Sequence, residues 1–98
     1  MLIQSVVQIE AERNEKMIRQ YEDLLSSLPR GSLVCRKKEY YYLKYREKGK
    51  LYDQYIGKDP ATVSDIRIKL DQRKHYEQML SVLRQEQKAI RKILEGLT

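Results

Sequence analysis

Residues 33–58 read LVCRKKEYYYLKYREKGKLYDQYIGK and hold six of the eight tyrosines of this 98-residue chain. Tyrosine and β-branched residues favour extended backbone, and the lysine-rich and glycine-containing interruptions are typical of turns. The segment therefore predicts an antiparallel β-meander over 32–58. Its strands are expected at 33–36, 40–46 and 50–56, with turns at 37–39 and 47–49.

The loop around Gly49 decides which side chains of the third strand share a face with the second. A two-residue loop requires a positive φ at Lys48, so a three-residue loop with left-handed Gly49 is favoured over it. That register predicts a solvent face of Tyr40, Tyr42, Lys44, Arg46, Lys50, Tyr52, Gln54 and Ile56. It predicts a face toward the helices of Tyr41, Leu43, Tyr45, Leu51, Asp53 and Tyr55. The two-residue alternative exchanges the faces of the third strand.

Residues 2–28, before the meander, show helical periodicity that is interrupted by polar residues at 10–15. The interruption is either a solvated turn or a place where Arg13 or Asn14 lies inside a helix seam, and a buried Asn there fixes register. Pro29 ends the predicted helix and Gly31 supplies a turn.

A second helix is predicted over 60–96, with Asp59 as N-cap, Pro60 at the first helical position and Gly96 as the C-terminal cap. A bend near 71–74 is an open alternative. Val63, Ile66 and Leu70 are expected to cover the sheet. A heptad stripe is expected to meet the first helix; it consists of Tyr76, Leu80, Leu83, Gln87, Ile90, Leu94 and Leu97.

The predicted fold class is α+β, in one domain over 1–98: an antiparallel helix pair with a three-stranded sheet at one end. Apolar residues gather in helical stripes, and the chain has no Phe and no Trp. A chain of this length has only modest stability alone, so we expect a homodimer through the helical stripes.

Positive charge is concentrated in the meander. The chain has a net charge of +6, and residues 30–58 alone carry nine Lys/Arg against three Asp/Glu. This balance favours an anionic partner, and tyrosine interleaved with cations favours nucleic acid, because bases stack on rings while phosphates pair with cations. The lone Cys35 suggests a reducing compartment, and no signal peptide or membrane span is apparent, so a cytoplasmic protein without a membrane partner is expected.

The sequence predicts a protein that is not an enzyme and holds no cofactor or metal. One cysteine and one histidine cannot assemble a Cys/His zinc site, and no phosphate-binding glycine motif is present. His75 is expected on a solvated helix surface, and Cys35 is expected to be a small core residue.

Three readings of function follow. The first is nucleic-acid binding, DNA rather than RNA, through Tyr40, Tyr42, Lys44, Arg46, Lys50 and Tyr52. The second is a protein-interaction module, such as a mobile-element-encoded inhibitor or adaptor that docks on a nucleoprotein complex through the same basic patch. The third is a structural coiled-coil protein.

A family resemblance supports the first reading. The string YYYLKYREKGKLYDQYIGKDP, followed by a charged helix, places residues 35–76 close to a known pattern. It resembles the three-stranded sheet plus helix of the arm-type DNA-binding module of phage and transposon tyrosine recombinases, and related modules of mobile-element proteins. The resemblance implies a sheet that enters the DNA major groove and contacts bases and phosphates with basic or polar side chains.

Overall fold

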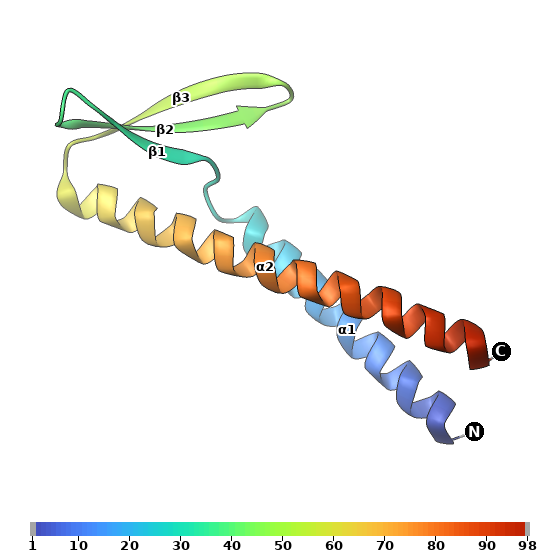
Figure 1. Cartoon of the computed structure of the whole chain (residues 1–98). Coiled ribbons are helices and arrows are strands. Elements are labelled where there is room, and N and C mark those ends of the chain that lie inside the picture. The colour runs from blue at the N-terminus through green and yellow to red at the C-terminus, as the bar shows by residue number, and fades with distance from the viewer. Residues whose placement is uncertain (1, 98) are drawn as a thin grey trace. The chain divides into compact units, whose positions relative to one another are not determined.

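The computed structural model describes residues 2–97, in the order helix, three strands, helix (Figure 1). The elements are α1 (Leu2–Ser26), β1 (Ser32–Arg36), β2 (Tyr40–Glu47), β3 (Lys50–Gly57) and α2 (Pro60–Leu97). The predicted α+β class is thereby confirmed. The described residues form two compact units, a helical unit of 2–27 with 75–97 and a sheet unit of 28–74.

The helix ends follow local signals, with two differences from prediction. Asp59 caps α2, since its carboxylate accepts bonds from the Ala61 amide at 3.4 Å and the Thr62 hydroxyl at 2.9 Å. α1 ends at Ser26, two residues before the expected end, where the hydroxyls of Ser26 and Ser27 bond to carbonyls of the last turn. The predicted cap at Gly96 is wrong, because α2 continues through Leu97. α2 is one continuous helix.

The helical unit is an antiparallel helix pair held by apolar side chains and one polar one. Ile18 packs with Leu80 and Leu83, so the heptad stripe meets α1 as predicted and is occupied within the chain. Farther along the seam, the rings of Tyr21 and Tyr76 lie 5.6 Å apart.

Asn14 lies inside this seam and is only 1% exposed, which decides between the two readings of the polar stretch 10–15. Its Nδ2 donates to the Leu83 carbonyl at 2.8 Å and to Glu86 Oε1 at 3.4 Å. Its Oδ1 is buried without a hydrogen-bond partner in the described structure. Asn14 therefore fixes the level at which α1 meets α2.

The sheet is the predicted meander, with strand order β1-β2-β3, but the favoured register of β3 is wrong. Glu47 pairs with Lys50, so the loop contains only Lys48 and Gly49, with φ of 50° and 80°. Two positive φ values characterise the hairpin turn whose twist matches that of the flanking strands. Lys48 has the positive φ that made this loop the less favoured prediction. The side chains of β3 therefore lie on the faces opposite to those predicted.

One face of the sheet, here called the inner face, carries the buried Leu43 of the sheet unit. Adjacent residues on a strand point to opposite faces, so Leu33 and Tyr41 lie on the same face as Leu43. Val63, at the start of α2, is the other buried residue of this unit. Tyr41 and Val63 line one depression, which supports the prediction for Val63, while covering of the sheet by Ile66 and Leu70 stays a prediction.

Gly31 allows the chain to enter β1. Its φ is +114°, and a Cβ at this position would run into the backbone carbonyl of Lys44 and lie 2.9 Å from the Cβ of Tyr45. Only glycine permits this close approach of two backbones.

Candidate nucleic-acid interface

The opposite face, here called the outer face, gathers the aromatic and cationic side chains. The pairing places Tyr42 opposite Tyr55, Lys44 opposite Asp53 and Arg46 opposite Leu51. With the neighbouring positions of β1 and β2, the outer face consists of Val34, Arg36, Tyr40, Tyr42, Lys44, Arg46, Leu51, Asp53 and Tyr55.

Three tyrosines form a cluster at one end of this face. The Tyr55 ring lies 5.3 Å from that of Tyr42 and 6.4 Å from that of Tyr40, both in tilted arrangements. Such tilted pairs are the favoured geometry for aromatic rings. Tyr55 is 57% exposed, so much of its ring is available to a ligand.

Arg36 crosses the sheet to complete the cluster. Its guanidinium carbon lies 4.7 Å from the centre of the Tyr42 ring, and its Nη2 bonds Asp53 Oδ2 at 3.0 Å. The ring of Tyr42 is thus covered on one side by Arg36, while the planar guanidinium is held by two partners. A guanidinium plane is itself a surface on which bases stack.

The cluster borders a shallow depression of about 590 Å³ lined by Arg36, Lys37, Tyr40, Tyr42 and Tyr55. Lys37 adds an exposed cation at the turn, where it has a φ of 56°. Farther along β2, Lys44 and Arg46 extend the positive charge over the same face. The arrangement offers rings for stacking beside cations for phosphate.

The structure brings together four of the six predicted site residues and separates the other two. Tyr40, Tyr42, Lys44 and Arg46 share the outer face, whereas Lys50 and Tyr52 lie on the inner face, so the predicted single surface is wrong in this part. Tyr52 stacks on Tyr45 with ring centres 5.3 Å apart. Sequence reasoning placed Tyr55 in the interior and did not select Arg36. The two-residue loop would have exposed Tyr55.

Comparisons with known proteins bear on the same segment. Residues 8–66 match the family described as Domain of unknown function (DUF6788), which is more than half of the chain. The chain belongs to this family. The DUF6788 segment includes the whole sheet, so the outer face lies in the part that defines the family.

No curated protein matched the chain, and no solved structure matched it. The family description names no activity, so the resemblance to arm-type modules stays a prediction.

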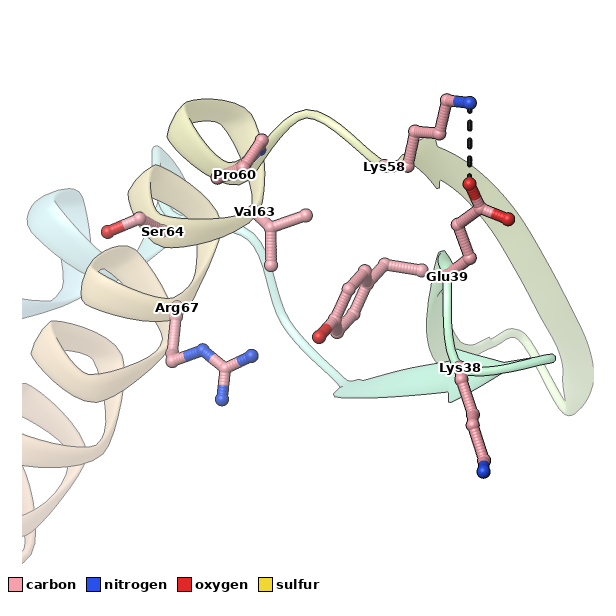
Figure 2. Close-up of a pocket in the computed structure, with 8 residues that line it drawn as sticks. Lys38, Glu39, Lys58, Pro60, Val63, Ser64 and Arg67 are labelled. Carbon is pink, nitrogen blue, oxygen red and sulfur yellow. Dashed lines mark hydrogen bonds and ion pairs between the residues drawn. The ribbon is translucent and has the colours of Figure 1, made fainter.

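A second depression of about 460 Å³ lies at the start of α2 and falls almost wholly in the DUF6788 segment. Figure 2 shows Val63 and Arg67 extending from the helix toward it, while Lys58 pairs with Glu39 at 3.4 Å. Tyr41 is the one aromatic residue among the described residues that line this depression, whereas three tyrosines line the depression on the outer face, and the second depression therefore ranks below the outer face as a site for stacking.

Other candidate groups are few in residues 2–97. Cys35 is exposed rather than part of a core, which corrects the prediction for it; it lies on the edge strand β1. His75 is exposed, as predicted, beside the ring of Tyr76. Among the described residues, no cluster of three acidic, cysteine or histidine side chains has a geometry suited to a metal ion. Neither described helix combines the length and apolarity that crossing a membrane demands.

Proposed function

We propose that this DUF6788 chain binds nucleic acid through the outer face of its sheet. The observation that carries the proposal is the combination of an exposed Tyr55 and the Arg36–Tyr42 pair with the cations Lys37, Lys44 and Arg46. Aromatic and guanidinium planes stack with unpaired bases, and lysine and arginine neutralise phosphates. The resemblance of residues 35–76 to an arm-type module favours DNA over RNA as the ligand.

Phosphate contacts and base stacking respond differently to salt concentration, so an experiment can distinguish them. Each phosphate contact releases condensed counterions, so the logarithm of affinity falls with the logarithm of salt concentration by about 0.7–0.9 per contact. Stacking on a tyrosine releases no ions and contributes about 1–3 kcal/mol per base. Charge substitutions should therefore change the salt slope, and ring substitutions should change the affinity at constant slope.

The experiment is fluorescence anisotropy with single-stranded DNA, double-stranded DNA and RNA oligomers at several salt concentrations. Replacing Lys37, Lys44 and Arg46 together by Gln should flatten the salt slope by about 2–3 units. A matched control removes three charges from α2 by replacing Arg84, Lys88 and Arg91 with Gln, and should leave most of the slope in place.

The contribution of the Tyr55 ring is tested by a matched pair of substitutions. Tyr55→Ala should weaken binding roughly 5- to 150-fold without a change in slope, while Tyr55→Phe should retain the affinity. If the three-charge variants on the sheet and on α2 behave alike, the outer face is not the binding surface. Should wild type bind none of the oligomers yet retain one protein in a pull-down that the sheet variant loses, the chain is a protein-interaction module instead.

A further inference from the structure

The helical unit carries a second apolar surface that the pairing of α1 with α2 leaves uncovered. On α1 the residue before each seam position is often apolar and exposed: Val6 precedes Val7, and Leu24 precedes Leu25. On α2 the same rule holds, since Val82 precedes the buried Leu83 and Ile93 precedes Leu94. These four side chains are between 44% and 57% exposed.

Both sets lie on one side of the helix pair. Successive residues of a helix are rotated by about 100°, so the residue before a seam position lies to one flank of the seam. The helices are antiparallel, because Ile18 meets Leu80 whereas Asn14 meets Leu83 and Glu86. In antiparallel helices the same sense of rotation brings both flanks to the same side. We call this side the apolar flank; it includes Ile3, Val6, Glu10, Arg13, Gln20 and Leu24 on α1 and Val82, Glu86, Ala89 and Ile93 on α2, each of which precedes a seam position.

The opposite side is polar throughout. The residues that follow seam positions are Gln8, Glu15, Arg19 and Glu22 on α1 and Arg84, Lys88, Arg91 and Glu95 on α2. Solvation of the helical unit therefore differs sharply between its two sides. An exposed apolar patch with this one-sided distribution marks an interface rather than scattered surface residues.

We propose that the apolar flank binds the apolar flank of a second copy of this chain, which forms a four-helix bundle of two helical units. The size of the flank is sufficient. At about 1.5 Å per residue α1 is about 37 Å long, and two helices are about 20 Å wide, which gives roughly 700 Å² on each subunit and a total above the ~1,000 Å² of specific interfaces.

Charge determines how the two copies are oriented. The charged residues of the apolar flank are Glu10, Arg13 and Glu86, and Glu10 forms an ion pair with Arg13 at 3.8 Å within α1. Arg13 and Glu86 lie at one level, because Glu86 accepts a hydrogen bond from Asn14, the neighbour of Arg13 in the chain. A twofold axis parallel to the helices places α1 across from α2 of the other copy, so Arg13 faces Glu86 of the partner subunit. A twofold axis perpendicular to the helices and at the level of Arg13 and Glu86 would place like charges opposite each other. Like charges across an interface are unfavourable, so the parallel axis is selected.

Sedimentation equilibrium of the full chain tests the dimer at micromolar concentrations. Wild type should sediment as a dimer of twice the 11.8 kDa chain mass. Val6→Glu should raise the dissociation constant at least roughly 100-fold, because each dimer would bury two new charges. Gln8→Glu introduces the same side chain on the polar side and should change the constant less than about threefold. A monomeric wild type, or equal effects of the two variants, would overturn the proposal.

A charge exchange tests the orientation. Arg13→Glu should weaken dimerisation roughly tenfold, and so should Glu86→Arg, while the double variant should return to within about threefold of wild type. Glu86→Gln keeps an oxygen acceptor for Asn14, so its effect on dimerisation reports the loss of the Glu86 charge without damage to the helix seam. Circular dichroism at 222 nm checks that each variant is folded. Neutral single variants, or a double variant as weak as the singles, would exclude the orientation in which α1 faces α2 of the partner subunit.

Discussion

Asn14→Leu should stabilise the helical unit, although it removes a buried hydrogen bond. The bond from Nδ2 to the Leu83 carbonyl is 2.8 Å long and contributes about 1 kcal/mol net. The buried Oδ1 without a partner costs about 1–3 kcal/mol, and burying the leucine contributes about 1.5–3 kcal/mol. Packing the larger side chain into the seam costs about 1–3 kcal/mol. The central values give a net stabilisation of about 1 kcal/mol.

The measurement is urea unfolding followed by circular dichroism at one fixed protein concentration. Asn14→Asp is the informative counterpart, because it buries a charge and turns an acceptor toward the Leu83 carbonyl; it should cost about 3 kcal/mol or more. A leucine variant that is less stable than wild type by 1 kcal/mol, or an aspartate variant of wild-type stability, would refute the assignment of Asn14 to a dry seam with one unsatisfied atom.

Three further stability predictions follow from the turns and the core. Gly31→Ala should cost about 3 kcal/mol or more in thermal unfolding, because a Cβ would strike the Lys44 carbonyl at a φ of +114°; a change below 1 kcal/mol would contradict this contact. Lys48→Asn should stabilise by about 0.5 kcal/mol, whereas Gly49→Val should destabilise by about 1–3 kcal/mol, and equal melting temperatures would exclude the two-residue turn. Leu83→Asp should unfold the helical unit itself, since Leu83 is 6% exposed within the chain; a fully helical spectrum would contradict its place in the core.

Several features of the candidate site could be predicted from the sequence. Tyr40, Tyr42, Lys44 and Arg46 alternate along one strand, and alternation along a strand fixes a shared face whatever the neighbouring strand does. Tyr55 and Lys50 lie on the next strand, and their faces depend on one loop. Arg36 became part of the site only through contacts with Tyr42 on β2 and Asp53 on β3, which no spacing along the chain indicates.

The sequence by itself determined where the elements begin and the order in which they come. Asp59 and Pro60 start α2 through bonds within a single turn, and the apolar periodicity of the helices is likewise a local property. Only the tertiary structure decided the register of β3 and the place of Asn14. The two faces of β3 have similar polarity, with Leu51, Asp53 and Tyr55 against Lys50, Tyr52 and Gln54, so hydrophobic pattern favoured neither register. The two-residue turn matches the twist of the strands, and the cross-strand pairs stabilise the sheet; together they outweigh the strain of one lysine at positive φ. These contributions arise only when the strands pair, so they are not visible in the sequence.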